Sequence, residues 1–403
     1  MKWNKIGRGS LASIVSVAMG LGLTACSKTY TVGYVYMTTA KANPGLMNGY
    51  EVDYQSGTLN VLTDSPIPTN GRNPVTVVAA PNGHFLYVLN HDDSTVTDFA
   101  IGTDGKVYPQ AVYNIGSGTN SPTLPTFPTA GSIDPSGKFL YVTFTYQGGY
   151  TTALPGPGGI AVFPINSDNT LGKPSTVNAG RNPVAITATN SNHFVYVVDQ
   201  DSATTQNLLA FTANTTTGLL TPLPGVTINN TNAASTGFAS GVTPNAILQD
   251  ASSQHLYITD QASNQVLTYS IGSTGVPTLI ATAPTDAGPD GLTIDVTGKF
   301  LFVVNYTAGT ISGYTFGSNG QPVPSTVAAS VQAGTGPTCI TTIGVPTNAN
   351  PSHAVYVYVS NQLSNNITGL QMNTTTGALE LIQNTPFSGS ALPTCITSVP
   401  SFR

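Results

Sequence analysis

Hydrophobic residues come in short runs of aromatic and β-branched side chains, separated by clusters of Gly, Pro, Asn and Ser. Phe85–Leu89, Thr95–Ile101 and Gln265–Ile271 are such runs, and their composition and length favour strands over helices. Turn residues stand between them, as in Pro81-Asn82-Gly83 and Thr103-Asp104-Gly105, and allow the chain to fold back on itself. The pattern predicts an all-β protein of short antiparallel strands.

One segment recurs along the chain. It starts with a proline, continues through a predicted strand and a turn, and reaches an aromatic residue 13 positions later. Five copies run Pro74–Tyr87, Pro128–Tyr141, Pro183–Tyr196, Pro244–Tyr257 and Pro289–Phe302. We assign a sixth copy to Pro337–Tyr356, with six extra residues in its turn, and a final short run after Pro393. The spacing of about 45–61 residues is that of propeller blades with four strands each.

The two ends of the chain complement each other. Val32–Met37, Gly49–Tyr54 and Thr58–Leu62 supply three strands of a blade that lacks its innermost strand, and Cys395–Val399 supplies the missing one. Such closure removes the open sheet edges that invite aggregation. We therefore predict a single seven-bladed β-propeller over residues 32–403, with the N- and C-terminal strands in one blade.

The N-terminus has the pattern of an export signal. Three positively charged residues, Lys2, Lys5 and Arg8, precede the apolar stretch Leu11–Leu23. That stretch is too short to span a bilayer. Leu23-Thr24-Ala25-Cys26 resembles the bacterial lipoprotein motif. The resemblance implies a signal peptide over residues 1–25, a diacylglycerol on Cys26 and a lipid-anchored linker over residues 26–31. An ordinary signal peptide with a chance cysteine is the alternative.

The membrane and the orientation follow from the same segment. Ser27 stands where lipoproteins retained at the inner membrane typically have Asp, so we expect the outer membrane in a cell with two membranes. The predicted topology puts the repeat prolines on one face, the top, and the tight hairpins on the other, the bottom. The first strand begins at the bottom, so we expect the bottom face to lie toward the membrane.

The strand ends point to a family. Tyr87–Asn90, Tyr196–Asp199, Tyr257–Asp260 and Phe302–Asn305 resemble the YVTN-type repeat. The run Pro-Ser-Gly-Lys-Phe-Leu-Tyr-Val at 135–142 resembles the lactonase-family seven-bladed propeller, which includes bacterial 6-phosphogluconolactonase. The resemblance covers about residues 32–399. Because the repeated residues build blades, it implies architecture more than activity.

Composition removes several functions. Charged residues make up 7% of the chain and the formal net charge is −5, so we expect no nucleic-acid partner. The only tryptophan, Trp3, lies in the predicted signal peptide, which excludes propeller classes built on repeated tryptophans. The chain has no Cys-x-x-Cys-His motif for haem attachment. We expect no cofactor, with Ca²⁺ as an open possibility, and a monomer.

Polar residues at the predicted top face are the candidate site. Arg72 and Arg181 occupy the same Gly-Arg-Asn-Pro position in two blades; each either clamps a neighbouring loop or binds an anionic ligand. Equivalent strand ends carry Asn90, Asp199, Asp260 and Asn305. These side chains either cap local turns or form a ring of oxygens for Ca²⁺ or sugar hydroxyls.

Two positions depart from the repeat. Asn245 and Asp290 directly follow their prolines, where the other repeats have Val or Thr. Blade building does not require this change, so these residues are our preferred polar ligand contacts. The longest top loops, Tyr146–Gly158 and Thr227–Gly241, are either solvated loops or a lid or partner-binding rim.

Histidine is scarce at the top face. His91 is the only histidine we place on a top loop, as an exposed residue or a general base. The other four lie in the predicted bottom hairpins: His84, His193, His255 and His353. The lactonase resemblance implies a His, Arg and Glu group at the channel, but the segment Phe127–Gly131 lacks its histidine and no Glu follows a strand-end Asn. His91, Asp260 and Asp290 remain as candidate catalytic residues.

Cys339 and Cys395 both lie in Pro-Thr-Cys-Ile-Thr on neighbouring inner strands. They are either small buried thiols or a disulfide, depending on whether their Cα atoms lie within about 7 Å. Two functions remain open. One is an envelope lipoprotein that binds a small molecule, glycan or protein through its top loops. The other is a lactone hydrolase of the 6-phosphogluconolactonase-like type.

Overall fold

The computed structural model describes residues 31–116, 126–145, 157–189, 193–230, 233–344 and 354–401. The chain divides into Met1–Tyr30 and a compact unit, Thr31–Arg403. The predicted signal peptide, Cys26 and the linker up to residue 30 lie outside the described residues, as do residues 146–156 of the long top loop and His353. In the part of the chain that is described, no helix has the length and apolar character to cross a membrane.

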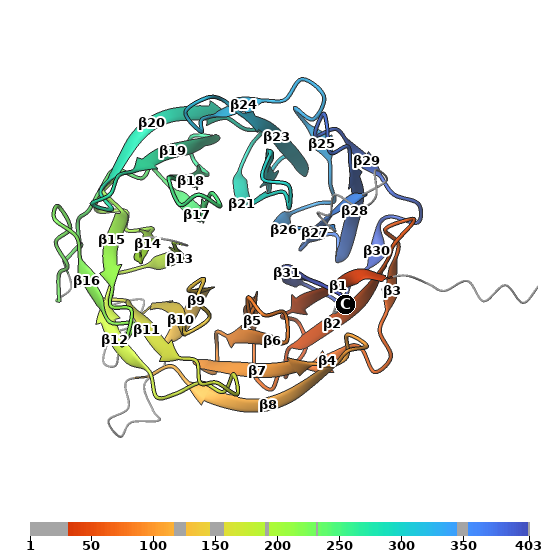
Figure 1. Ribbon diagram of the computed structural model, residues 1–403, viewed down its shortest axis with the longest axis horizontal. Coiled ribbons are helices and arrows are strands. Elements are labelled where there is room, and N and C mark those ends of the chain that lie inside the picture. Colours follow the sequence, from red (N-terminus) through yellow and green to blue (C-terminus); the bar gives the residue numbers. More distant parts are fainter. Residues whose placement is uncertain are drawn as a thin grey trace, which may run out of the picture. The chain divides into compact units, whose positions relative to one another are not determined.

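The described strands form seven antiparallel sheets, which we call blades 1–7 (Figure 1). Blade 1 contains β1 (Thr31–Thr39), β2 (Leu46–Asp53), β3 (Leu59–Val61), β4 (Ile67–Pro68) and β31 (Pro393–Pro400). Blade 2 contains β5 (Pro74–Ala79), β6 (Phe85–Asn90), β7 (Thr95–Ile101) and β8 (Val107–Asn114). Blade 3 contains β9 (Phe127–Ile133), β10 (Phe139–Thr145), β11 (Gly159–Pro164) and β12 (Ser175–Asn178).

The remaining four blades follow the same order. Blade 4 contains β13 (Pro183–Ala188), β14 (Phe194–Asp199), β15 (Leu208–Ala213) and β16 (Leu220–Pro222). Blade 5 contains β17 (Pro244–Gln249), β18 (His255–Asp260), β19 (Gln265–Ile271) and β20 (Pro277–Pro284). Blade 6 contains β21 (Pro289–Ile294), β22 (Phe300–Asn305), β23 (Thr310–Phe316), β24 (Pro322–Pro324) and β25 (Val331–Gln332). Blade 7 contains β26 (Pro337–Ile343), β27 (Val355–Asn361), β28 (Asn366–Met372), β29 (Leu379–Leu381) and β30 (Phe387–Ser388).

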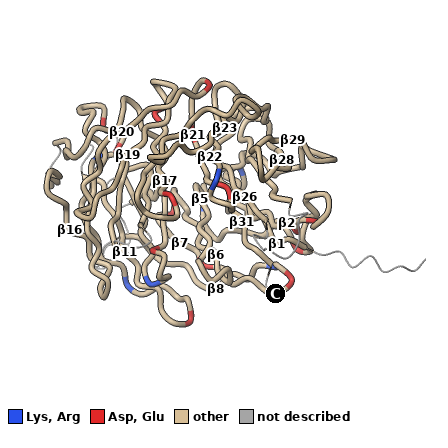
Figure 2. The backbone as a smooth tube through the Cα atoms, turned by 45° about the horizontal axis from the view of Figure 1, so that its top comes forward, with Lys and Arg blue, Asp and Glu red and all other residues tan. Residues whose placement is uncertain are grey.

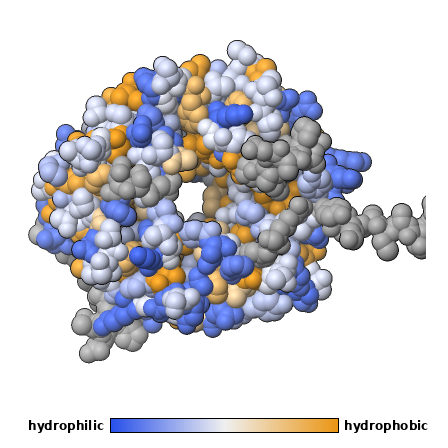
Figure 3. Space-filling view, viewed as in Figure 1, coloured by the Kyte–Doolittle hydropathy of each residue, from blue (hydrophilic) through white to orange (hydrophobic). Residues whose placement is uncertain are grey.

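The innermost strands close a ring around a channel. Each contacts the innermost strand of the next blade, in the order β5, β9, β13, β17, β21, β26, β31 and back to β5. In the space-filling view an opening remains at the centre of this ring (Figure 3). The predicted seven-bladed all-β propeller is confirmed.

The shared blade is also confirmed. β1 pairs antiparallel with β31, with Val35 opposite Ser398 and Met37 opposite Ile396, and the sheet order is β3-β2-β1-β31. The start of β1 lies beside a tight hairpin of blade 2, because the Tyr34 hydroxyl donates to the Thr103 carbonyl at 3.2 Å. The first described strand therefore begins on the face of the tight hairpins, as the topology predicts.

The repeated tyrosines join neighbouring blades. Their buried hydroxyls donate to a carbonyl in a hairpin of the next blade, at 2.5–2.9 Å: Tyr36 to Gly105, Tyr87 to Asn169, Tyr196 to Gly275, Tyr257 to Gly320 and Tyr358 to Gly57. In four of these five contacts the accepting hairpin residue is glycine, which lets the hairpin approach closely; the fifth is Asn169, which has a φ of +65°. At Gly105, with a φ of +77°, an added Cβ would lie 2.2 Å from the ring of Tyr34. The repeated aromatic residue therefore packs in the core of its own blade and, where it is tyrosine with such a bond, also contacts the next blade.

The sixth repeat needs a correction. We aligned it to end at Tyr356, but Pro337 pairs with Asn361, as Pro74 pairs with Asn90. Tyr358, three residues before Asn361, is therefore the equivalent of Tyr87, and its hydroxyl reaches Gly57 at 2.5 Å. The error arose because this blade has a longer turn between its first two strands, which made the distance from the proline an unreliable guide.

Candidate functional site

The residue after each proline lines the inner ring. Two threonines at this position donate to the backbone of the next blade: Thr129 to the Pro183 carbonyl at 2.6 Å and Thr338 to the Thr394 carbonyl at 3.1 Å. Thr394 donates within blade 1, to the Thr38 carbonyl at 3.2 Å. Thr129 and Thr338 thus connect neighbouring blades near the channel. A threonine at this position therefore has a structural function.

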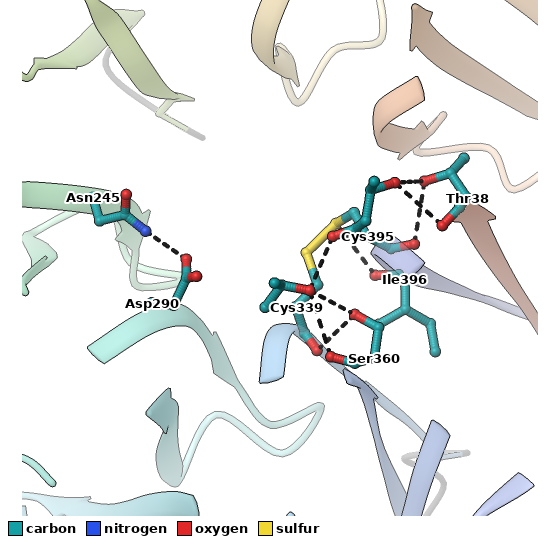
Figure 4. The surroundings of a disulfide bond; sticks show 9 residues. Thr38, Asn245, Asp290, Cys339, Ser360, Cys395 and Ile396 are labelled. Atoms are coloured by element: carbon teal, nitrogen blue, oxygen red, sulfur yellow. Dashed lines mark hydrogen bonds between the residues drawn. A yellow bond between two sulfur atoms is a disulfide. The ribbon is translucent and has the colours of Figure 1, made fainter. Parts of the chain in front are cut away.

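Asn245 and Asp290 replace that arrangement with a side-chain pair. The Asn245 amide donates to the Asp290 carboxylate, and the Gln200 amide donates to Asn245 Oδ1 at 3.1 Å. The chain of contacts runs from blade 4 through blade 5 to blade 6. In Figure 4, Asn245 and Asp290 point toward one another from adjacent strands, next to the central opening. The structure thus brings together the two residues that depart from the repeat.

The electrostatics of Asp290 differ from those of a surface carboxylate. Burial raises the pKa of Asp290 to about 7, although the hydrogen bond from Asn245 acts in the opposite direction. Thr259 on β18 donates its hydroxyl to the Asp290 carbonyl at 2.9 Å and so holds the backbone in place. A carboxyl group that titrates near neutral pH can accept a hydrogen bond or exchange a proton.

Both candidate arginines are paired with carboxylates. Arg72 lies 2.6 Å from Asp93 through its guanidinium, and it also donates to the Asp92 carbonyl at 3.1 Å. The guanidinium of Arg181 makes two hydrogen bonds to Asp201. Each arginine therefore bonds to the loop that follows the second strand of its own blade. The predicted clamp on a loop carbonyl is seen at Arg72, whereas the bonds described for the Arg181 guanidinium go to the Asp201 carboxylate. Anion binding by either arginine stays a prediction.

The two ion pairs differ in burial. The Asp201 side chain is 2% exposed and that of Arg181 is 21% exposed. Burial alone would raise the pKa of Asp201, but the hydrogen bonds from Arg181 and from the Ala203 backbone lower it overall. The Arg72 side chain, by contrast, is 51% exposed. The same motif thus forms a buried pair in blade 4 and a solvent-screened pair in blade 2.

The strand-end residues are buried inside their own blades. Asp199 accepts the backbone N–H groups of Arg181 and Asn182 at 3.1 and 2.6 Å, and burial raises its pKa to about 6. Asp260 accepts those of Val242 and Thr243 at 3.1 and 2.9 Å. Both carboxylates stabilise the turn that precedes the inner strand. Asp260 also accepts a hydrogen bond from Ser263 in the following turn, where we expected capping, and one from Gln265 at 3.2 Å.

The two asparagines at equivalent ends bind a different strand. Asn90 donates to the hydroxyls of Thr95 and Thr97 at 3.2 and 3.0 Å, and Asn305 donates to those of Thr310 and Ser312 at 3.1 and 2.9 Å. All four strand-end residues are fully buried. Asn361 of blade 7 belongs to the same set, since its Oδ1 accepts the Gly334 N–H at 3.0 Å. The sequence analysis missed it for the same reason that it misplaced the sixth repeat.

His91 is held between two neighbours. Its ring stacks on Phe127 of blade 3 with centroids 4.8 Å apart and 19° between the planes. Nδ1 lies 2.7 Å from Asp92 Oδ1, which also accepts the Asn73 amide at 3.1 Å. A carboxylate at Nδ1 favours the tautomer protonated there and leaves Nε2 as a base. The side chain is 31% exposed, so this pair has the geometry of an oriented general base.

The remaining described histidines lie where the sequence predicted. His84 and His193 are exposed residues in the hairpins between the first two strands of their blades. His255 differs, because it is half-buried and its Nδ1 lies 2.9 Å from Asp250 Oδ2. It packs on Gly320 of the next blade, in the position that an aromatic ring takes elsewhere. His255 is therefore part of the blade contact.

Cys339 and Cys395 form a disulfide across blades 7 and 1, with Cα atoms 5.0 Å apart (Figure 4). Of the alternatives that the sequence left open, the structure has the bonded one. The strands are close enough because the innermost strands of neighbouring blades converge on the channel. The loop Thr227–Gly241 is also partly tied to its blade, since Phe238 pairs with Leu208. Among the described residues, no group of three or more His, Cys, Asp or Glu side chains is placed to hold a metal ion.

Comparison with known proteins agrees with this architecture. The family model "Lactonase, 7-bladed beta-propeller" matches residues 118–231 and 227–341. The chain therefore belongs to the lactonase seven-bladed β-propeller family. No curated protein matches the chain in sequence.

Solved structures resemble the chain in fold. A periplasmic gluconolactonase of Pseudomonas aeruginosa aligns with a TM-score of 0.70 and 17% identity, over 92% of this chain and 99% of that one. A candidate 6-phosphogluconolactonase of Bacteroides uniformis aligns with a TM-score of 0.68 and 17% identity, over 91% and 99%. Another from Bacteroides fragilis aligns with a TM-score of 0.67 and 18% identity, over 93% and 99%. At these identities the likeness establishes the fold.

Proposed function

We propose that the protein is an exported, lipid-anchored, monomeric propeller that binds a polar ligand at the top of its channel without a cofactor. One observation carries the binding role: Asn245 and Asp290 put a hydrogen-bonded polar pair at positions where the other blades have Val or Thr. The carboxylates of Asp199 and Asp260 accept hydrogen bonds within their own blades, and the Arg181 guanidinium is paired with Asp201. The Asn245–Asp290 pair is therefore the favoured contact for a ligand.

The anchor determines which face meets the ligand. The start of β1 lies beside the tight hairpin that contains Thr103, so lipid on Cys26 would hold the bottom face toward the membrane. In a cell with two membranes we propose the outer one. Cys26→Ser in the full-length chain should abolish incorporation of labelled palmitate and move the protein to the soluble fraction. A variant that stays lipid-labelled and membrane-bound would refute the anchor.

Orientation can be measured separately. A fluorophore at Asp92, on the top face, should be quenched less by labelled lipid than one at Asn82, in a bottom hairpin. Stronger quenching at Asp92 would reverse the proposed orientation.

Ligand binding is tested by calorimetry on the full-length protein in detergent, with sugars, sugar lactones, sugar acids and short peptides as probes. Asn245→Ala should weaken any detected binding at least tenfold. Thr338→Val is the matched control, because Thr338 occupies the equivalent position but bonds to the next blade. Equal losses in both variants, or none in either, would contradict a site at Asn245 and Asp290.

Lactone hydrolysis is the second candidate, and the His91–Asp92 pair favours it. In the proposed step, His91 Nε2 removes a proton from water and the water oxygen attacks the lactone carbonyl. The ring C–O bond then breaks, and the leaving oxygen takes a proton to give a hydroxy acid. The family and the lactonase-named structural neighbours are compatible with this reaction. The glutamates Glu51 and Glu380 lie on β2 and β29, away from the inner strands.

Lactone hydrolysis can be tested directly. Acid release from glucono-1,5-lactone, corrected for spontaneous hydrolysis, should fall at least 100-fold in His91→Gln and stay unchanged in His84→Gln, a histidine in an exposed bottom hairpin. Arg181→Ala and Asp290→Asn report whether the other polar residues take part. Release at the uncatalysed rate by the native protein would remove this candidate and leave the binding role.

A further inference from the structure

The channel wall carries a single ionisable side chain apart from the disulfide cysteines. The seven inner strands β5, β9, β13, β17, β21, β26 and β31 contain no Lys, Arg, His or Glu, and their one carboxylate is Asp290. Charged residues are sparse along the whole described backbone (Figure 2). The charge at Asp290 is therefore not balanced by a cation on the strands that surround the opening.

The two arginines of the candidate site are paired with other carboxylates. The guanidinium of Arg181 bonds to Asp201 and that of Arg72 to Asp93, so each is neutralised in its own loop. Around Asp290, the identified polar side-chain contact is the neutral amide of Asn245. An anionic ligand at this position would meet a carboxylate without a compensating positive charge.

The hydrogen-bonding capacity of Asp290 suits hydroxyl donors. Its Oδ1 accepts the Asn245 amide, and among the described residues no hydrogen bond reaches Oδ2. A carboxylate accepts hydrogen bonds only, whereas Asn245 offers amide N–H donors beside it. A ligand with neighbouring hydroxyl groups can donate to Oδ2 and accept from the amide.

Asp290 bonds to blade 5 through Asn245 but, among the described residues, makes no side-chain hydrogen bond toward blade 7. Gly291, directly after Asp290, lets blade 6 approach blade 7 so closely that an added Cβ would lie 2.5 Å from the Thr338 carbonyl. Thr338, at the position equivalent to Asp290, donates to the Thr394 carbonyl of the next blade, which an ionised carboxylate cannot do. The substitution thus removes an inter-blade donor and adds an acceptor beside the channel.

We infer that Asp290 makes this site selective for an uncharged polyhydroxyl ligand, such as a neutral sugar or sugar lactone, over the corresponding sugar acid or sugar phosphate. The inference rests on the proposed binding function and specifies its ligand class. It makes Asp290 the residue that sets charge selectivity and Asn245 its hydrogen-bonding partner.

The test compares glucose, glucuronate and glucose 6-phosphate on the full-length protein by calorimetry at about pH 8, where Asp290 is mostly ionised. We expect both anions to bind at least tenfold more weakly than glucose. Asp290→Asn should narrow that ratio at least fivefold. Asp290→Thr, which restores the residue of the equivalent blades, is the second variant in case the first does not fold. Asp168→Asn, in an exposed hairpin, is the charge-matched control and should leave the ratio unchanged.

The results separate a failure of the proposed charge selectivity from a failure of the proposed binding function. If an anion binds as tightly as glucose or more tightly, and Asn245→Ala weakens it, the selectivity is refuted and the binding site stands. If none of the three sugars binds, the ligand class is refuted, and the wider probe set decides the binding function. If a folded Asp290 variant keeps the native ratio of glucose affinity to anion affinity, Asp290 does not set the charge selectivity.

Discussion

The hydroxyl of Tyr36 donates a 2.6 Å hydrogen bond to the carbonyl of Gly105, a residue 69 positions away in the neighbouring blade. Equivalent bonds recur around the ring, so the repeated tyrosine serves two functions: its ring fills the core of one blade and its oxygen holds the hairpin of the next. These bonds add to the contacts between the innermost strands of neighbouring blades. Contacts of this kind therefore set how strongly neighbouring blades are coupled.

Tyr36→Phe should lower the free energy of unfolding by about 1–2 kcal/mol, because it leaves the buried Gly105 carbonyl without its donor. Tyr141→Phe is the matched control, since no hydroxyl bond of the same kind is present at Tyr141 among the described residues. Urea titrations of both variants measure the difference. Equal losses would mean that the hydroxyl bond contributes little.

Gly105→Ala and Gly137→Ala separate backbone strain from crowding. Both glycines have a left-handed φ, +77° and +72°, but an added Cβ meets Tyr34 at Gly105 and nothing within 4 Å at Gly137. Gly137→Ala should cost about 1–2 kcal/mol from the backbone conformation alone. Gly105→Ala should cost about 1–3 kcal/mol more from overpacking. Similar Tm values for the two variants would argue against close packing of this hairpin.

Removal of the disulfide should destabilise the ring at its closure. Cys339 and Cys395 are 56 residues apart in sequence, for which chain entropy predicts a stabilisation of about 4 kcal/mol. The double variant Cys339→Ala/Cys395→Ala should therefore unfold at lower denaturant concentration than the oxidised protein. Thiol titration of the unfolded, unreduced protein should find neither cysteine free. Two reactive thiols would show that the bond does not form.

Arg181→Met should destabilise the protein far more than Arg72→Met. The first leaves the carboxylate of Asp201 buried without its partner, at a cost of about 2–3 kcal/mol, while Asp93 stays hydrated when Arg72 is lost. Chemical denaturation of the two variants tests this. Equal losses of stability in the two variants would contradict the prediction that burial of the ion pair determines how much each arginine stabilises the fold.

Asp290→Asn should change how stability depends on pH. The folded pKa of about 7 lies above the ordinary value of 3.8, so the folded state binds this proton more tightly than the unfolded state. The associated stability is fully present below about pH 4 and is lost as pH rises to about 7. Relative to the native protein, the variant should gain on the order of 2–4 kcal/mol between pH 4 and 8. A constant difference across that range would contradict the shifted pKa.

The sequence was sufficient to predict the architecture because each blade repeats the same proline, turn and aromatic residue. It was less reliable where a turn lengthens: Tyr358, not Tyr356, occupies the repeat position in blade 7. The sequence showed that Asn245 and Asp290 both depart from the repeat, but it did not predict the hydrogen bond between them. The contact itself depends on how closely two inner strands converge, which the spacing along the chain does not report.

Other parts of the site depend on neighbours from other blades or on loop conformation. Arg72 and Arg181 look identical in sequence, yet their carboxylate partners lie at different positions in the following loops, Asp93 and Asp201. The stacking of His91 on Phe127 joins two blades and has no local signal. Asp199 and Asp260 were recognised as repeated oxygens, but the backbone N–H groups that they accept belong to turns 17–18 residues earlier.

The pairing of β1 with β31 imposes an order on assembly. The first strand of the domain has no permanent neighbour on one side until the last strand has been synthesised and, for an exported chain, delivered across the membrane. A product that stops before Pro393 would expose the backbone of β1 and forfeit the cysteine that fastens blade 7. Only a chain that reaches Pro400 can therefore complete the pairing of β1 with β31 and close the ring.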